Sequence, residues 1–120
     1  MRETIVINSK NEMHFIKQCE ILYCQSENYA THILKTNDQK ITAAKPLSTF
    51  LKLLDKTLFV RISQSYLVNS MHIVKIDKKE CTVLLSNGDT IPYTISIKQW
   101  VKSCLGSEGS KLYDSIEEPM

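Results

Sequence analysis

The 120-residue sequence is poor in several features that define large classes of protein. It has no apolar run near the roughly 20 residues that a membrane-spanning helix needs, so we expect no segment to cross a bilayer. Its three glycines are too few for a glycine-rich loop that cradles phosphate groups. The N-terminal stretch alternates apolar with polar residues and lacks the continuous apolar core of a secretory signal. These absences favour a single cytoplasmic domain.

Metal-binding and catalytic groupings are also lacking. The four cysteines include no CxxC pair and fall mostly within apolar or amphipathic patterns, so we expect buried, reduced thiols. They are Cys19, Cys24, Cys81 and Cys104. Their spacing to the histidines is not typical of a zinc site, and no arrangement of serine, histidine and carboxylate suggests a nucleophile. The sequence therefore predicts neither an enzyme nor a cofactor.

Arginine is scarce in a chain that is mildly basic. Arg2 and Arg61 are the only arginines, so the bidentate arginine contact to guanine, the commonest specific base contact, has few residues to make it. The net charge is +2 overall, but residues 1–105 carry 14 basic and 9 acidic side chains, whereas residues 106–120 carry 1 basic and 4 acidic. Such a balance permits contact with nucleic acid without requiring it.

Short β-prone runs make up most of the chain. Ten runs of four to six residues are rich in Ile, Val, Thr and Tyr and are bounded by turn-forming residues. They cover residues 4–8, 13–17, 20–25, 30–35, 40–44, 59–62, 65–69, 72–77, 81–86 and 90–94. Between the last two, Asn87 and Gly88 predict a two-residue hairpin turn with positive φ at both positions. The pattern predicts a mainly β fold.

Two segments depart from the strand pattern. Apolar residues recur at i, i+3, i+4 and i+7 behind Pro46, which predicts a helix near 46–54 with that proline at its first position. The same spacing near 96–105, with Ser96 as the cap and Gly106 as the stop, predicts a second helix. Residues 106–120 are small and acidic, so we expect residues 1–105 to form the domain and the rest a disordered tail. The predicted core includes Phe50, Leu51, Tyr66, Leu67, Val68, Ile73, Trp100 and Val101.

The stretch "FVRISQSYLVN", residues 59–69, is β-prone at both ends and polar in the middle. Strict alternation along it would give neither face a clean apolar side, so a turn must interrupt the run near Ser63 and Gln64. From the pattern alone, this turn is either a polar loop between two strands or a surface that contacts another molecule.

Three stretches in order make the chain resemble the LytTR DNA-binding domain family, the output module of many bacterial response regulators. They are "CEILYCQSENYATHILKTND", "KPLSTFLKLLDKTLFVRISQSYLVNSMHIVKI", and "VLLSNGDTIPYT" followed by a basic C-terminal helix. The resemblance covers roughly residues 4–105. It implies stacked β-sheets of about ten strands, with one short helix between strands and another at the C-terminus.

The resemblance also implies a mode of DNA binding. Family members insert side chains from loops and strand ends, rather than from a recognition helix, into successive major grooves and bend the duplex. By position, three segments of this chain correspond to the contact segments: residues 28–30, 63–65 and 95–96. The implied DNA-binding residues, with two lysines of the last helix and Arg61 added, are Asn28, Tyr29, Arg61, Ser63, Gln64, Ser65, Ser96, Lys98 and Lys102.

This chain departs from many family members at those positions. Ser63 and Gln64 stand where many members have histidine and arginine, and Thr94 to Ser96 stand where they have a serine followed by arginines. Gln64 can still pair with adenine, and the serines can donate to phosphate oxygens. The departures therefore remove basic groups without removing every means of contact.

Most of these residues also have a plainer alternative role, which for Ser63 and Ser65 is turn and cap chemistry. Gln64 would be a solvated turn residue, Ser96 only a helix cap, and Tyr29 a residue at the edge of the core. Arg61 could bind a phosphate or pair with a carboxylate across the sheet. The two lysines, Lys98 and Lys102, would simply form a solvated helix face.

The leading hypothesis is a bacterial transcription regulator that binds double-stranded DNA through loops in the major groove. We expect no receiver domain, because the parallel α/β pattern and acidic cluster of receivers are missing from the sequence. A homodimer on DNA and a protein partner are both compatible with this hypothesis. The alternative is that the same fold serves as a protein-interaction or regulatory module whose DNA-binding face has been neutralised.

Overall fold

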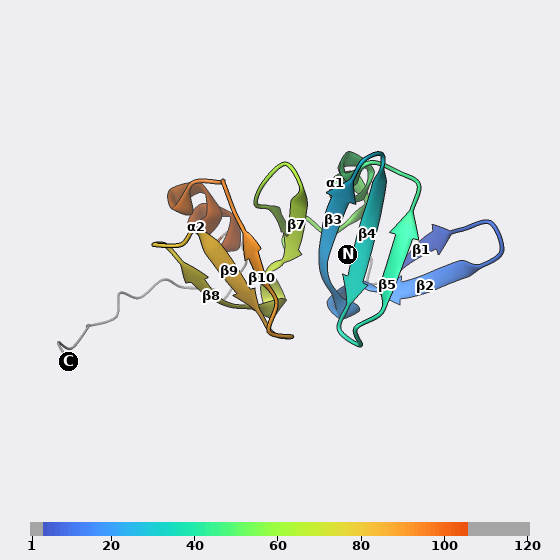
Figure 1. Ribbon diagram of the computed structural model, residues 1–120, viewed down its shortest axis with the longest axis horizontal. Coiled ribbons are helices and arrows are strands. Elements are labelled where there is room, and N and C mark those ends of the chain that lie inside the picture. The colour runs from blue at the N-terminus through green and yellow to red at the C-terminus, as the bar shows by residue number, and fades with distance from the viewer. Residues whose placement is uncertain (1–3, 106–120) are drawn as a thin grey trace.

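Three antiparallel sheets organise residues 4–105, which are the residues that the computed structural model describes. The central sheet has the strand order β5-β4-β3-β7-β6, with the β1-β2 hairpin on one side and the sheet β10-β9-β8 on the other (Figure 1). The strands are β1 Thr4–Asn8, β2 Met13–Lys17, β3 Ile21–Glu27, β4 Ala30–Lys35, β5 Lys40–Ala43, β6 Phe59–Arg61, β7 Tyr66–Asn69, β8 Ile73–Asp77, β9 Thr82–Leu85 and β10 Thr90–Pro92. The predicted mainly β fold of ten strands is confirmed.

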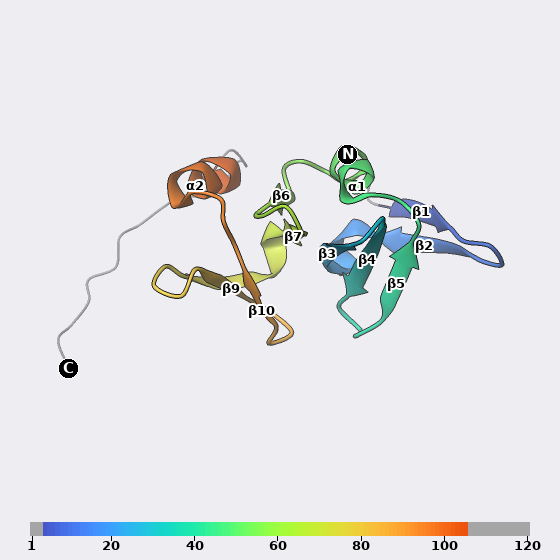
Figure 2. The ribbon, with the colours of Figure 1, turned by 45° about the horizontal axis from the view of Figure 1, so that its top comes forward.

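The two α-helices lie apart, with α2 near one end of this arrangement and α1 near its middle (Figure 2). Helix α1 spans Leu47–Leu53 beside the β1-β2 hairpin, and α2 spans Ile97–Leu105 near β9 and β10. Both predicted helices are confirmed, but Pro46 precedes α1 as its N-cap in extended backbone and is not its first helical residue. Short 3₁₀ helices, Gln18–Glu20 and Ser70–His72, connect β2 to β3 and β7 to β8.

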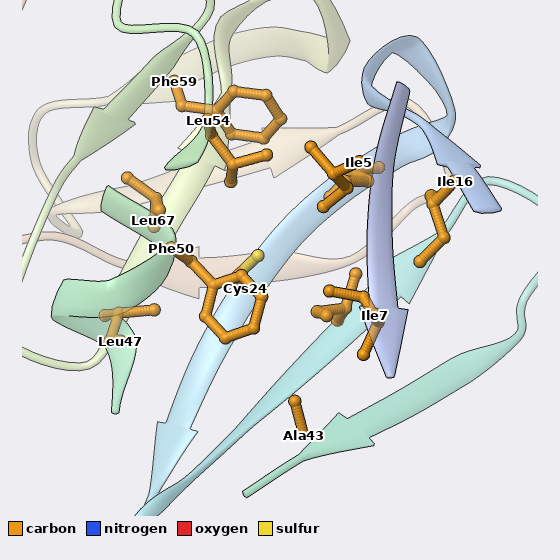
Figure 3. Close-up of a cluster of buried hydrophobic side chains, with 12 residues drawn as sticks. Ile5, Ile7, Ile16, Cys24, Ala43, Leu47, Phe50, Leu54, Phe59 and Leu67 are labelled. Carbon is orange, nitrogen blue, oxygen red and sulfur yellow. The ribbon is translucent and has the colours of Figure 1, made fainter. Parts of the chain in front are cut away.

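A first hydrophobic core fills the space between the β1-β2 hairpin, α1 and one face of the central sheet. Figure 3 shows its side chains gathered there, with Leu67 of β7 facing Phe50 of α1. Its buried members are Ile5, Ile7, Ile16, Ile21, Cys24, Ile33, Ala43, Leu47, Phe50, Leu54, Phe59 and Leu67. The period-2 alternation of strands places the next residue along β7, Val68, on the opposite face of the sheet.

That opposite face forms a second hydrophobic core with β8, β9, β10 and α2. Trp100 is fully buried there and meets the ring of Tyr93 edge to face, with centroids 5.0 Å apart. A β-bulge between Ile21 and Tyr23 lets the neighbours Leu22 and Tyr23 both enter this core. Of the predicted core residues, Phe50, Leu67, Val68 and Trp100 are buried, and Leu51, Tyr66, Ile73 and Val101 are half-buried.

One buried polar residue joins the central sheet to the chain segment before β3. The Asn69 amide nitrogen donates to the carbonyls of Gln18 and Ile21 at 3.2 and 2.9 Å, and its side-chain oxygen accepts from the Met71 amide at 3.0 Å. All three bonds reach backbone groups, two carbonyls and one amide. Asn69 therefore caps the local amide of Met71, and it also bonds two carbonyls that lie 51 and 48 residues away in the sequence.

The hairpin turn between β9 and β10 differs from the prediction. Of Asn87 and Gly88, only Gly88 has positive φ, at +94°. The Leu85 amide donates to the Asp89 carbonyl at 2.9 Å. Residues 86–88 thus form a three-residue loop rather than a two-residue one. A type I turn followed by a single left-handed residue reverses the chain as well as two positive φ values do, so the prediction of the turn type was wrong.

The expectation of buried cysteines was also partly wrong. Cys24 is fully buried in the first core, but Cys19 and Cys81 are exposed. Cys81 ends the β8-β9 turn with φ +55°, and Cys19 lies in a 3₁₀ helix, so both sit in connections rather than on an inward-facing strand position. The Cys104 side chain and the predicted tail, residues 106–120, lie outside the described residues. No helix among the described residues is long and apolar enough to span a membrane.

Candidate nucleic-acid interface

The polar centre of residues 59–69 forms a tight turn between β6 and β7. The Ile62 amide donates to the Tyr66 carbonyl at 3.0 Å, which closes the turn around residues 63–65. The Ser63 hydroxyl oxygen accepts from the amides of Ser65 and Tyr66, each at 3.2 Å. Gln64 and Ser65 are left exposed at the tip. The predicted turn is present, and the Ser63 side chain stabilises it through these two hydrogen bonds.

Arg61 extends into the same turn from the end of β6. Its Nε donates to the Ser63 carbonyl at 3.2 Å, and its Nη2 donates to the Gln64 carbonyl at 2.9 Å. Among the described residues, the ion pairs involve histidines, and no carboxylate pairs with Arg61. The predicted alternative of a carboxylate partner across the sheet is therefore wrong, because two turn carbonyls take that place.

The first predicted contact segment is the tip of the β3-β4 hairpin. Glu27 pairs with Ala30, so Asn28 and Tyr29 form a two-residue loop, in which Asn28 has φ +57°. Asparagine tolerates this left-handed conformation better than most residues. The Tyr29 side chain is 92% exposed, so the alternative that placed it at the edge of the core is wrong.

The third predicted segment is the entry to α2. The Ser96 hydroxyl oxygen accepts from the Gln99 amide at 3.1 Å, so the predicted helix cap is confirmed. Lys98 and Lys102 are exposed and four residues apart, which places them on one side of α2, away from the buried Trp100. No carboxylate pairs with either lysine in the part of the chain that the structure describes.

Backbone hydrogen bonds join the three segments to one another. The Ser26 amide, next to the hairpin tip, donates to the Ser65 carbonyl at 2.8 Å, and the amides of Thr94 and Ile95 donate to the Ile62 carbonyl at 2.8 and 3.1 Å. The β3-β4 turn, the β6-β7 turn and the link from β10 to α2 accordingly lie at the same end of the molecule, at the top of Figure 1. We call the exposed surface of residues 28–29, 63–65 and 94–98, together with Lys102, the contact face.

A row of polar side chains crosses the central sheet directly below the contact face. His32 Nδ1 lies 2.8 Å from the Thr42 hydroxyl, its Nε2 lies 3.4 Å from the Glu27 carboxylate, and the Gln25 amide donates to the Tyr66 hydroxyl at 3.1 Å. Strand register places these residues side by side across β5, β4, β3 and β7. This row could not be predicted from the sequence, because its members are far apart in the chain and only the strand register brings them together.

Taken together, the fold and the contact face define a class of mainly β domain that presents side chains from loops and strand ends. Within the described ranges, no group of three histidine, cysteine or acidic side chains is arranged to hold a metal ion. A sequence model described as the LytTr DNA-binding domain matches residues 11–106. The chain belongs to this family of non-catalytic DNA-binding domains.

Individual relatives agree with this assignment. The transcriptional regulatory protein LytR of Staphylococcus aureus strain N315 is 28% identical over 107 residues, and that of strain MW2 is 27% identical. Each alignment covers 87% of this chain but 43% of the relative, so the chain spans less than half the length of these regulators. A solved structure described as the LytTr DNA-binding domain of a Bacillus cereus response regulator has a TM-score of 0.71. At 21% identity, over 89% of this chain and all of that one, it supports the fold.

Proposed function

We propose that this chain acts in the bacterial cytoplasm as a transcription regulator that inserts loops of the contact face into the major groove of duplex DNA. The observation that carries the proposal is the set of backbone hydrogen bonds that hold three exposed segments, distant in sequence, on one face. Membership of a DNA-binding family and similarity to proteins named transcriptional regulators support it.

Gln64 is the proposed base-reading residue. It is exposed at the tip of the central turn, and a side-chain amide can pair in bidentate fashion with N6 and N7 of adenine in the major groove. Asn28, at the hairpin tip, offers the same chemistry one segment away. Because an amide matches adenine and not guanine, we propose that adenine is read where many family members place arginine.

The remaining residues of the contact face are proposed to position the backbone. The hydroxyls of Ser63, Ser65 and Ser96 can each donate to a phosphate oxygen, since the bonds that Ser63 and Ser96 form within the chain use the oxygen as an acceptor. Tyr29 can contact phosphate or sugar. Lys98 and Lys102 are the two cations of the face, so the dependence of affinity on salt should be shallow, about 0.9 in slope for each phosphate neutralised.

Selection from a random duplex library at low salt tests the proposal directly. We expect an enriched motif that contains adenine, and we expect Gln64→Ala to reduce discrimination at one adenine by about 1–3 kcal/mol. Gln39→Ala is the matched control, because Gln39 is an exposed glutamine in the β4-β5 turn at the opposite end of the molecule. The number of copies bound to the selected duplex, measured by analytical ultracentrifugation, decides whether a homodimer forms.

Two results would contradict the proposal. One is the absence of both an enriched motif and a mobility shift at micromolar protein, which would favour the protein-interaction alternative. The other is a selected motif whose base preference is changed equally by Gln64→Ala and Gln39→Ala, since only Gln64 belongs to the contact face.

A further inference from the structure

We infer that Arg61 is a positioning residue, which fixes the direction of the Gln64 side chain and does not itself neutralise a phosphate. The inference rests on the proposed function, in which Gln64 reads a base. Its starting point is the pair of hydrogen bonds from the guanidinium to the carbonyls of Ser63 and Gln64, at 3.2 and 2.9 Å.

These two carbonyls belong to the peptide groups on either side of the Gln64 Cα. The Ser63 carbonyl lies in the peptide group that precedes Gln64, and the Gln64 carbonyl lies in the one that follows. The peptide group is planar, so holding both groups restrains φ and ψ of Gln64 together. The direction of the Gln64 Cα–Cβ bond follows from these two angles, and Arg61 therefore sets the direction in which the Gln64 side chain leaves the backbone.

One other contact of the turn acts on the same peptide groups, because the Ser65 amide, which donates to the Ser63 hydroxyl, belongs to the peptide group that follows Gln64. The Ser63 hydroxyl holds the amides of Ser65 and Tyr66, and the Ser65 carbonyl accepts from Ser26. These bonds do not use the carbonyls of Ser63 and Gln64, to which the Arg61 guanidinium donates. Removing Arg61 should therefore loosen the tip and leave the β6-β7 pairing intact.

Guanidinium geometry distinguishes this role from a simple phosphate contact. Arginine offers several N–H donors in a rigid planar fork, so it can serve two carbonyls at once, whereas the lysine ammonium is a compact point charge on a flexible stem. Arg61→Lys keeps the charge and loses the fork. A positioning role predicts that Lys fails at this position, and a phosphate contact predicts that Lys largely succeeds.

The DNA-binding test compares Arg61→Lys and Arg61→Met with the unchanged chain on the selected duplex, and on a duplex altered at the adenine assigned to Gln64. We expect both variants to reduce the preference for that adenine at least fivefold, with the slope of log affinity against log salt unchanged. Lys98→Met is the matched control: its slope should fall by about 0.9 while its base preference stays the same. The inference is overturned if Arg61→Lys keeps the base preference, or if Arg61→Met lowers the slope and leaves the preference intact.

A measurement without DNA separates this inference from the proposed function. Hydrogen exchange followed by NMR should show that the amides of Ser65 and Tyr66 exchange at least fivefold faster in Arg61→Met and Arg61→Lys, because their hydrogen bonds depend on the turn geometry. The amides of Val60 and Val68 should exchange at unchanged rates. Unchanged exchange in the turn would overturn the inference whether or not the chain binds DNA, and if no duplex is selected this measurement alone decides it.

Discussion

At the scale of single residues, the cysteines show how position in the fold sets reactivity. Cys24 lies in the first core, where burial raises the pKa of its thiol to about 12, whereas Cys19 and Cys81 are exposed. The thiolate is the reactive form of cysteine, so a buried neutral thiol is inert. The three side chains thus differ in chemistry although the sequence offers no motif that separates them.

Alkylation should reveal this difference. With iodoacetamide at pH 8, we expect Cys19 and Cys81 to be modified in the folded chain and Cys24 to be modified only in denaturant. Peptide mapping by mass spectrometry after timed quenching measures each site separately. Equal rates at Cys24 and Cys81 in the folded chain would contradict the assigned burial.

The same thiol should make stability depend on pH in alkaline solution. Its folded-state pKa of about 12 is raised above the ordinary value of 9.0, so from pH 9 upwards the unfolded chain loses this proton while the folded chain keeps it. The free energy of unfolding should then fall as pH rises, by up to about 1.4 kcal/mol per pH unit from this group. Urea unfolding between pH 8.5 and 10 measures the slope. Cys24→Ala should flatten it, and an equal slope in that variant would assign the effect to other groups.

The role of Arg61 could not be read from the sequence for a simple reason. Its partners are the backbone carbonyls of the residues two and three positions ahead. Every residue has such a carbonyl whatever its side chain, so no residue type in the sequence marks the partner. By contrast, Ser96 could be predicted as a cap, because serine at the start of a helical repeat is a local pattern. Side-chain identity predicts a contact only where the partner is also specified by side chain or by local periodicity.

At the scale of elements, local patterns predicted the strands and helices well. All ten strands lie within two residues of their predicted bounds, because period-2 alternation and turn-forming residues are both local properties. Turn geometry was less predictable. Loops 36–38 and 86–88 each close through a bond between the residues that flank them, and each has positive φ at its third residue, Asp38 or Gly88.

These two turns invite a paired test. Gly88→Ala should destabilise the domain by about 1–2 kcal/mol, because the φ of +94° is unfavourable for a residue with a Cβ. An added Cβ would meet no atom within 4 Å, so no steric clash adds to this cost. Asp38→Gly places glycine at the equivalent position, where φ is +65°, and should change stability by less than about 0.5 kcal/mol. Urea denaturation of both variants measures the effects. A neutral Gly88→Ala would mean that the β9-β10 turn can adopt another geometry.

At the scale of the whole molecule, one sheet is shared by two hydrophobic cores. Leu67 faces the first core and Val68 the second, so neither core can form on its full surface without β7. The sequence could not predict this division, because the bulge that sends both Leu22 and Tyr23 to one face interrupts the alternation within β3. We expect the two cores to unfold together.

The only tryptophan provides a test of that cooperativity. Ile7→Ala removes a buried side chain from the first core and should cost about 2–5 kcal/mol. Although Trp100 lies in the second core, its fluorescence transition in urea should shift as far as the far-UV circular dichroism transition. Val6→Ala is the control, since Val6 immediately precedes Ile7 on the same strand and is 42% exposed. Separate transitions in Ile7→Ala would indicate two independently unfolding layers.

The bonds that join the contact face run from backbone to backbone, from Ser26 to Ser65 and from Thr94 and Ile95 to Ile62. Such bonds form whatever side chains these residues carry, with proline as the main exception among donors. Substitutions in the loops can therefore accumulate during evolution without dismantling the platform that displays them. Under the proposed function, a change from histidine and arginine to serine and glutamine at the tip would alter which operator is read while the scaffold stays the same, so that shape and specificity are inherited separately.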